Sequence, residues 1–266
     1  MVKLFVTDLD GTLLPTGQKV SDENIKAVQA AVNSGVIVTI ATGRMYKAAL
    51  PVAKNLGVDV PIITYNGALI KSTAGKVLYE SAVAPEYAKK VIEYCRAKNY
   101  YLQLYSNDEL YFAEYTDKSA AYENSQHIKG HTVGWDGLYN HLTGVSKLLS
   151  ITDGLSETTA RIAEMENAIG DGVKVTRSNA NYVEIINKGI SKAAGIKRLA
   201  EKLGISMSET MSIGDADNDL PMLKATAKSI AMGNAQDNIK EVCDYVTASC
   251  EENGFAAAIY KYVLEK

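Results

Sequence analysis

Hydrophobic and polar positions in the first 80 residues alternate between short apolar runs and stretches with helical periodicity. The runs Val2 to Thr7 and Val36 to Ala41 are too short for helices. The first predicts a buried strand, and the second, which is hydrophobic on both faces, predicts a parallel strand covered on two sides. Between them we expect a helix that is capped by Ser21 and ended by Gly35. Its apolar positions, three and four residues apart, are Ile25, Val28 and Val32.

The same alternation continues along the chain and resumes after a long middle segment. After a predicted helix over Met45 to Leu56, we expect a third strand over Pro61 to Tyr65 and a hairpin over Ala68 to Tyr79. From Ile190 onward the predicted elements are a helix over residues 191–203, strands over 211–213, 229–231 and 245–247, and a helix through residue 262. Alternating strands and helices are typical of an α/β fold, here a Rossmann-like doubly wound parallel sheet.

The middle segment has a different pattern from about Ser81 onward. Pro85 suits the first turn of a helix, and strands are expected over residues 101–106 and 110–115, which is typical of an α+β domain. We therefore divide the chain into core residues 1–81, an inserted α+β cap domain over residues 82–186, and core residues 187–266. The insert carries a net charge of −4 and the flanking segments carry +1.

The composition excludes several classes of protein. The chain has 266 residues, a net charge of −3 and 47% hydrophobic residues, so its core is large enough to need no metal or disulfide. It has no run rich in Lys and Arg, which argues against nucleic acid as a partner. No apolar stretch approaches the ~20 residues of a membrane-spanning helix, and the start of the chain lacks the pattern of a signal peptide. Three cysteines in no CxxC spacing fit a reducing compartment, and we expect a cytoplasmic protein.

Two aspartates separated by one residue follow the first predicted strand, in the segment Asp8-Leu9-Asp10-Gly11-Thr12-Leu13. Ligands of open α/β sheets bind at the carboxyl ends of the strands, so acidic side chains at this point are poorly explained by packing. An Asx turn is an equally good explanation for a lone Asp-x-Asp sequence. The rest of the sequence decides between them.

A second acidic cluster, Gly214-Asp215-Ala216-Asp217-Asn218-Asp219, follows the predicted strand over residues 211–213. An EF-hand calcium loop is excluded, because its glycine position would be Leu220 and its glutamate position Thr226. Carboxylates from two loops suit Mg²⁺, which prefers a few carboxylates, water and substrate phosphate. They also need a cation, since like charges at close quarters raise one another's pKa.

Two further segments offer what a phosphate group needs. Thr42-Gly43-Arg44 follows the second strand, and we expect it to begin a helix whose exposed N–H groups bind an anion. Lys192 opens a later helix, although most lysines are solvated surface residues. Either signal alone is weak.

In chain order these four segments resemble the motifs of the haloacid dehalogenase (HAD) superfamily of phosphatases. The motifs are DLDGTL, TIATGR with Thr42, Lys192, and GDADND. The insertion point and the long α+β insert are similar to the Cof-type subfamily, whose large cap is of the C2 type. ITYNGA at residues 63–68 and Asn253-Gly254 are also similar to Cof-type sugar phosphatases.

The resemblance implies a role for each motif residue. Asp8 would be the nucleophile that forms an aspartyl-phosphate, and Asp10 the general acid and then the general base. Dehalogenases lack an acid at the second position, so Asp10 favours phosphate esters over carbon–halogen bonds. Mg²⁺ would be held by the Asp8 carboxylate, the Asp10 backbone carbonyl and Asp215, with Asp219 supporting them from the outer shell. The phosphoryl group would be bound by Thr42, Gly43, Lys192 and Asn218.

The insert is expected to close over the site and to read the leaving alcohol. Asn179, Asn181 and Glu184 are weak candidates for substrate contact, and Arg44 either reaches the substrate or pairs with a carboxylate. The three histidines (His127, His131 and His141) all lie in the insert, and we expect them to be exposed and not catalytic.

The leading interpretation is a Mg²⁺-dependent phosphatase of small phosphorylated metabolites, above all sugar phosphates. One alternative is a phosphosugar mutase, which would return the phosphoryl group to a second hydroxyl. The other is a non-catalytic regulatory protein that binds a phosphometabolite. The intact set of catalytic positions argues against the second alternative.

Overall fold

The computed structural model describes residues 1–15, 19–57 and 59–264. They form two compact units. The core unit comprises Met1–Tyr79 and Ser191–Lys266, and the insert unit comprises Glu80–Ile190. The insert unit therefore begins two residues before, and ends four residues after, the segment 82–186 marked out from the sequence. Among the described residues, no helix is both long and apolar enough to cross a membrane.

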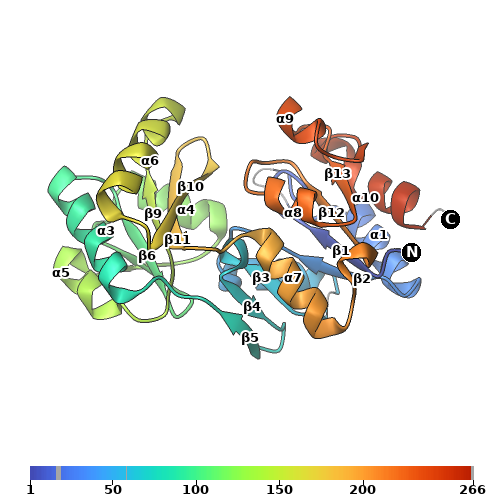
Figure 1. Ribbon diagram of the computed structural model, residues 1–266, viewed down its shortest axis with the longest axis horizontal. Coiled ribbons are helices and arrows are strands. Elements are labelled where there is room, and N and C mark those ends of the chain that lie inside the picture. Colours follow the sequence, from blue (N-terminus) through green and yellow to red (C-terminus); the bar gives the residue numbers. More distant parts are fainter. Residues whose placement is uncertain (16–18, 58, 265–266) are drawn as a thin grey trace. The chain divides into compact units, whose positions relative to one another are not determined.

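The core unit is built on a five-stranded sheet in which every neighbouring pair is parallel (Figure 1). In the order of the sheet its strands are β14 (Tyr245–Val246), β13 (Lys228–Ala231), β12 (Thr210–Gly214), β1 (Leu4–Thr7) and β2 (Ile37–Ile40). The chain order of these strands reverses at β1. At such a switch point, loops at the carboxyl ends of neighbouring strands leave room for a ligand.

Helices cover both sides of this sheet. Helix α1 contacts α10 on one side, and α7 contacts α8 on the other (Figure 1). The helices of the core unit are α1 (Asp22–Asn33), α2 (Tyr46–Asn55), α7 (Lys192–Leu203), α8 (Leu220–Ala225), α9 (Asp237–Lys240) and α10 (Gly254–Ala258). Short helical turns are η1 (Tyr65–Gly67), η3 (Met207–Glu209), η4 (Cys250–Glu252) and η5 (Ile259–Leu264).

Helix α1 begins as expected, since the Ser21 side chain accepts a hydrogen bond from the backbone N–H of Asn24. Its buried face is different from the predicted one. Val32 is 46% exposed, whereas Asn24 is 1% exposed. The Asn24 side chain donates to the Leu13 carbonyl and accepts from the Ala256 N–H, so its polar atoms are satisfied inside the protein.

The segment Thr42–Arg44 does not begin a helix, and that prediction is wrong. Helix α2 starts at Tyr46, after Met45 in an extended conformation. The carbonyls of Thr42 and Arg44 instead accept hydrogen bonds from the backbone N–H groups of Asn66 and Tyr65. These bonds hold the segment as a loop.

A small three-stranded sheet follows β2, in the order β3 (Ile62–Thr64), β4 (Leu69–Lys71) and β5 (Val77–Glu80). Residue Ile63 of β3 forms a parallel bridge with Ala41, which attaches this sheet to the end of β2. The predicted hairpin is present, and its turn is closed by hydrogen bonds from the Gly75 N–H to the Ser72 carbonyl and from the Ser72 N–H to the Lys76 carbonyl.

The insert unit has a six-stranded sheet that is antiparallel except for its β7–β8 pair. In the order of the sheet its strands are β10 (Val173–Asn179), β11 (Tyr182–Asn187), β9 (Val145–Ile151), β6 (Gln103–Ser106), β7 (Glu109–Phe112) and β8 (His131–Thr132). Its helices are α3 (Pro85–Lys98), α4 (Asp117–Gln126), α5 (Gly134–Leu138), the turn η2 (Tyr139–His141) and α6 (Leu155–Ile169). Apolar residues of α3 and α6 form one core with the apolar residues of the sheet.

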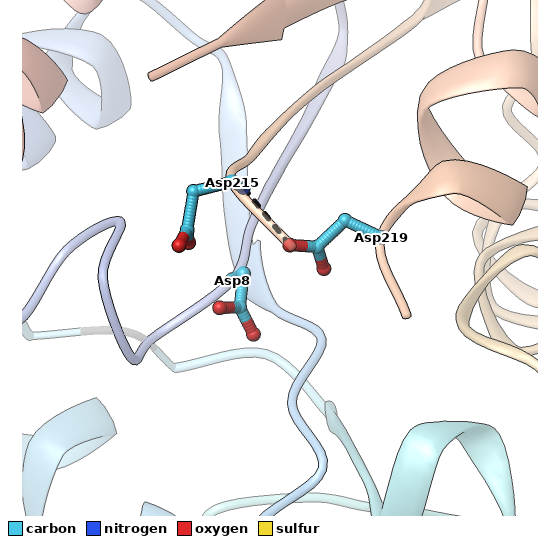
Figure 2. A group of neighbouring side chains, drawn as sticks. All are labelled: Asp8, Asp215 and Asp219. Atoms are coloured by element: carbon cyan, nitrogen blue, oxygen red, sulfur yellow. Dashed lines mark hydrogen bonds between the residues drawn. The ribbon is translucent and has the colours of Figure 1, made fainter. Parts of the chain in front are cut away.

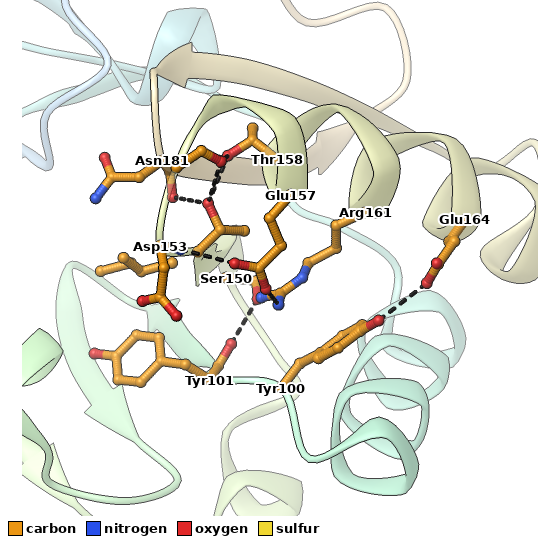
Figure 3. A network of polar contacts seen from close by, with 12 residues as sticks. Tyr100, Tyr101, Ser150, Asp153, Glu157, Thr158, Arg161, Glu164 and Asn181 are labelled. Atoms are coloured by element: carbon orange, nitrogen blue, oxygen red, sulfur yellow. Dashed lines mark hydrogen bonds and ion pairs between the residues drawn. The ribbon is translucent and has the colours of Figure 1, made fainter.

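Polar contacts fix α6 to this sheet (Figure 3). Arg161 of α6 is 5% exposed, and its guanidinium donates to the Ser150 hydroxyl, 2.8 Å away, and pairs with Glu157. The same group lies over the ring of Tyr100, with 3.7 Å between its Cζ and the ring centroid. We attribute a structural role to Arg161, because its guanidinium joins α6 to Ser150 of β9 and to the ring of Tyr100.

Candidate functional site

The two acidic clusters meet at the carboxyl edge of the core sheet. Strands β1 and β12 are parallel neighbours, and the Asp8 N–H donates to the Ile213 carbonyl at 3.1 Å. Asp8 and Asp215 therefore follow adjacent strand ends. Figure 2 shows their side chains together with that of Asp219, which comes from the start of α8.

Carboxylate oxygens of Asp8, Asp215 and Asp219 lie within 4.8 Å of one another. Asp8 is 5% exposed and Asp219 is fully buried, so water does little to screen their charges. Three carboxylates at this distance repel one another strongly. A cluster of this kind requires positive charge at close range.

Lys192 supplies part of that charge. It is the first residue of α7, whose N-terminus is capped by the Ser191 side chain. The Lys192 ammonium is fully buried and lies 2.5 Å from Asp8 Oδ1 and 2.6 Å from Asp219 Oδ1. The capped helix start thus holds one cation between two carboxylates that are far apart in the sequence.

Asp219 has both of its oxygens engaged. Oδ1 accepts from Lys192, and Oδ2 accepts from the backbone N–H groups of Asp215 and Ala216, each at 3.0 Å. These bonds fold the acidic loop around the Asp219 carboxylate and fix the backbone at Asp215. The geometry suits a supporting role for Asp219 outside the direct ligand set.

The pKa values reflect the excess of negative charge. Burial and the neighbouring carboxylates, chiefly Asp219, raise the pKa of Asp8 well above its usual range, although Lys192 opposes them. Burial and Asp219 likewise raise the pKa of Asp215 to about 6. Burial lowers the pKa of Lys192, but Asp219 and Asp8 outweigh it and raise that pKa above its ordinary value.

The residues fit a divalent metal ion. Lys192 offers a single positive charge to a cluster of three carboxylates, which leaves an excess of negative charge at the site. Hard oxygen donors such as these are the ligands of Mg²⁺ and similar cations. Asp8 and Asp215 are the carboxylates that would contact the ion.

Asp10 has its side chain paired with Arg44. The Arg44 Nε and Nη2 atoms lie 2.8 Å and 2.5 Å from the two Asp10 carboxylate oxygens, which is a bidentate pair. The Asp10 side chain is 54% exposed and that of Arg44 is 12% exposed. Of the two alternatives for Arg44, the structure shows the pair with a carboxylate.

The three remaining predicted phosphate-binding residues lie close to one another. Thr42 is 1% exposed, and its hydroxyl accepts a hydrogen bond from the Arg44 N–H at 3.1 Å. The Asn218 amide donates to Asn66 Oδ1 at 3.2 Å, and the same oxygen would lie 3.2 Å from a Cβ built on Gly43. Asn66 therefore joins Asn218 to the Thr42–Gly43 loop.

Three residues near the site were not predicted from the sequence as site residues. The Thr12 hydroxyl donates to Asp215 Oδ1 at 2.6 Å, and the Asn234 amide donates to the Gly11 carbonyl at 2.9 Å. Asn66 is the third. Thr12 and Asn66 lie inside motifs that were recognised, but no sequence pattern marks Asn234.

The weak candidates in the insert unit have other partners. Glu184 pairs with Lys147 at 2.7 Å, and both side chains are 2% exposed. Asn179 accepts a hydrogen bond from the neighbouring Ala180 N–H, and the Asn181 carbonyl accepts one from the Thr152 N–H. His127 and His131 are exposed, while His141 is half-buried and stacks on Tyr111.

Comparison with known proteins identifies the family. Residues 5–259 match the family described as haloacid dehalogenase-like hydrolase. The chain is 30% identical over 263 residues to the 5-amino-6-(5-phospho-D-ribitylamino)uracil phosphatase YcsE of Bacillus subtilis (strain 168), an alignment that covers 99% of this chain and 96% of the relative.

Solved structures agree. That of the HAD subclass IIB sugar phosphatase BT4131 has a TM-score of 0.88 at 27% identity and covers 99% of this chain and 100% of that chain. A haloacid dehalogenase-like hydrolase from Bacteroides thetaiotaomicron has a TM-score of 0.88 at 28% identity and covers 98% of this chain and 99% of that one. The expected fold and the expected enzyme class, a phosphoric monoester hydrolase, are thereby confirmed. With the four motifs brought together at one sheet edge, this chain belongs to the haloacid dehalogenase-like hydrolase family.

Proposed function

We propose that this protein is a Mg²⁺-dependent phosphatase that hydrolyses phosphate monoesters of small metabolites, with sugar phosphates as its preferred class. The observation that carries the proposal is the position of Lys192, which bridges Asp8 and Asp219 beside Asp215. This arrangement supports roles for Asp8 as the nucleophile, Lys192 as a fixed cation, and Asp8 and Asp215 as metal ligands. Phosphoryl transfer needs little beyond such positioning and charge stabilisation.

In the first step the Asp8 carboxylate attacks phosphorus. A bond forms between the Asp8 oxygen and phosphorus, and the bond between phosphorus and the leaving oxygen breaks. Asp10 in its protonated form gives its proton to that oxygen, so an alcohol departs and Asp10 is left as a carboxylate. Once Asp10 is a carboxylate, the bidentate contact from Arg44 orients its side chain for the second step.

In the second step water attacks the phosphorus of the Asp8 acyl phosphate. The Asp10 carboxylate takes a proton from this water, and the bond between phosphorus and the Asp8 oxygen breaks. Inorganic phosphate leaves, and Asp8 and Asp10 return to their starting forms. One carboxyl group thus serves as acid and then as base.

Charge is the main obstacle, because an anion attacks an anion. Lys192 lies against Asp8 and is placed to contact the transferring group, while Thr42, Gly43 and Asn218 would hold its oxygens. Mg²⁺, when held by the Asp8 carboxylate, the Asp10 carbonyl and Asp215, would supply Lewis-acid stabilisation of the phosphoryl charge.

The choice of substrate class is supported by similar proteins, a sugar phosphatase and a phosphatase of a phosphorylated ribityl compound. Both names describe a phosphate ester on a polyhydroxylated carbon chain. We therefore propose this ester type for the present chain.

Release of inorganic phosphate from p-nitrophenyl phosphate and from a panel of sugar phosphates, with and without MgCl₂, tests the proposal. We expect Mg²⁺-dependent release that Asp8→Asn abolishes without loss of the fold. The matched control is Asp217→Asn in the acidic loop, since Asp217 is outside the carboxylate cluster and the change should leave turnover largely intact. An isomerised sugar phosphate without free phosphate would indicate a mutase, and no reaction with any ester would favour a binding protein.

A further inference from the structure

The turn Tyr65–Gly67, which follows β3, has an unusual backbone. Its three consecutive residues all have positive φ values, of 51°, 56° and 104°. Tyr65 is fully buried and Asn66 is 4% exposed. A left-handed conformation is unfavourable for a residue with a Cβ, so two such residues in succession persist only where their surroundings hold them.

Backbone hydrogen bonds fasten this turn to the predicted phosphate-binding loop. The Tyr65 N–H donates to the Arg44 carbonyl at 3.0 Å, and the Asn66 N–H donates to the Thr42 carbonyl at 2.9 Å. These carbonyls stand on either side of Gly43. The left-handed turn is thus the partner that shapes the loop between β2 and α2.

The Asn66 side chain reaches a second element. Its Oδ1 accepts a hydrogen bond from the Asn218 amide at 3.2 Å, while the same oxygen packs against Gly43. Asn218 follows β12, whereas Thr42 and Gly43 follow β2, and β1 separates these strands in the sheet. Asn66 therefore bridges the loop that follows β12 and the loop that follows β2, on either side of β1.

Gly67 touches a third element. A Cβ on Gly67 would lie 2.3 Å from the Ser191 carbonyl oxygen, which no side chain allows. Ser191 caps the helix whose first residue is Lys192. The turn therefore contacts three segments to which we assign phosphoryl contacts, although its own side chains need not touch the substrate.

We propose that Asn66 is a positioning residue whose side chain orients the Asn218 amide toward the phosphoryl group, while the backbone of the turn holds the Thr42–Gly43 loop. The amide nitrogen of Asn218 carries two hydrogens. One is bound by Asn66, which fixes the rotation of the amide and directs the other toward a ligand oxygen. Without that bond the amide would sample other rotamers, and the entropy lost in ordering it would weaken phosphate binding.

Asn66→Gly separates this role from the role of the backbone. Glycine tolerates a left-handed conformation, so the substitution removes the amide without adding strain. Asn99→Gly is the matched control, because Asn99 is also left-handed (φ 53°) but caps α3 in the insert unit. Both variants should keep melting temperatures close to that of the unaltered protein.

The inference rests on the proposed function, and its test measures binding as well as turnover. Affinity for inorganic phosphate in the presence of MgCl₂ is measured by calorimetry, and kcat and KM by p-nitrophenyl phosphate hydrolysis. We expect Asn66→Gly to weaken phosphate binding about tenfold, as for loss of a hydrogen bond to a charged group, and Asn99→Gly to leave it unchanged.

A double-mutant cycle distinguishes orientation of Asn218 from a general structural effect. If Asn66 acts through Asn218, the variant Asn66→Gly/Asn218→Ala should bind phosphate no more weakly than Asn218→Ala alone. Additive losses would overturn the proposal, as would unchanged phosphate affinity in Asn66→Gly or a parent protein that binds no phosphate.

The two proposals fail in different ways. A protein that binds phosphate with the predicted coupling but hydrolyses no ester would refute the proposed function and support the role of Asn66. Mg²⁺-dependent hydrolysis without coupling between Asn66 and Asn218 would support the proposed function and refute the role of Asn66.

Discussion

The ammonium nitrogen of Lys192 lies 2.6 Å from Asp219 Oδ1, and both side chains are fully buried. The same nitrogen is 2.5 Å from Asp8. One cation is therefore shared by two buried carboxylates. Removing one member of a buried ion pair leaves an uncompensated charge, which is far more costly than the loss of an exposed pair.

Lys192→Met should consequently lower the free energy of unfolding by about 3–5 kcal/mol in metal-free buffer. It should also abolish phosphate release, because Asp8 and the transferring group lose their fixed cation. Urea denaturation in the presence of EDTA measures the first effect. Lys197→Met changes an exposed lysine of the same helix and should stay within about 0.5 kcal/mol of the parent. Equal stability of the two variants would refute the role given to the buried ammonium.

Gly11→Ala should weaken Mg²⁺ binding about 10- to 100-fold, as a disturbed support for a metal ligand does. A Cβ on Gly11 would lie 2.4 Å from Asp215 Oδ2, so the carboxylate has to move. Gly75→Ala is the matched control. Both glycines have positive φ, 80° and 92°, but nothing lies within 4 Å of a Cβ on Gly75. Each variant should lose about 1–2 kcal/mol of stability from backbone strain, and calorimetric titration with MgCl₂ should separate them.

Much of the site could be predicted because parallel strands end at one edge. Asp8 and Asp215 are far apart in the sequence, yet each follows an apolar run that forms a strand, and β1 and β12 are neighbours. The position of Lys192 at a predicted helix start was only a weak signal, and its role was predicted through the resemblance to a family. As a residue type it gives no sign that it is buried between Asp8 and Asp219.

The errors have a common physical cause. Periodicity assigned Val32 to the buried face of α1 and left out Asn24, because the side-chain amide looks polar until its partners are known. Those partners include the Ala256 N–H, 232 residues away. The segment Thr42–Arg44 was likewise predicted to begin a helix. It forms a loop instead, because its carbonyls bind a turn that follows a different strand. Local patterns cannot supply partners that come from distant parts of the chain.

Mg²⁺ should raise the melting temperature of the parent protein, because it binds the folded cluster and not the unfolded chain. At a concentration 100 times its dissociation constant, the ion should add about 2.7 kcal/mol of stability. Asp215→Asn removes a carboxylate ligand and should abolish most of this shift. Thermal unfolding with EDTA and with graded MgCl₂ measures it. A shift in Asp215→Asn as large as that of the parent would place the metal elsewhere.

Asp10→Asn should impair alkyl phosphates more than aryl phosphates. An alkoxide needs a proton to leave, whereas p-nitrophenolate does not, so loss of the general acid should slow the first step about 10²- to 10⁴-fold only for alkyl esters. The second step is slow for both ester types, because the variant also lacks the general base that activates water. Rapid mixing with p-nitrophenyl phosphate should therefore give a burst of one p-nitrophenolate per site followed by slow turnover. A loss of both steps to the same extent with both ester types would contradict the acid role.

Glu123 offers a test of stability in the insert unit, which contains none of the three clustered carboxylates. Its side chain is 3% exposed, and its oxygens accept from the Gly130 N–H at 2.8 Å, the Lys129 ammonium at 2.9 Å and the Tyr115 hydroxyl at 3.0 Å. Burial raises the pKa of Glu123, but these donors outweigh it and lower that pKa below its ordinary value. The ionised form therefore stabilises the fold.

Because the pKa of Glu123 is lower in the folded state, its contribution is fully present above the unfolded value of about 4.3 and is lost as the pH falls through the folded value. Glu123→Gln should be less stable than the parent by about 1–3 kcal/mol at pH 7, and this difference should shrink below about pH 4.3. Fluorescence of Trp135, the only tryptophan, reports unfolding of the insert unit. Glu166→Gln, at an exposed position of α6, should show no such pH dependence. A difference between Glu123→Gln and the parent that stays constant down to pH 3 would show that the charge of Glu123 does not stabilise the insert unit.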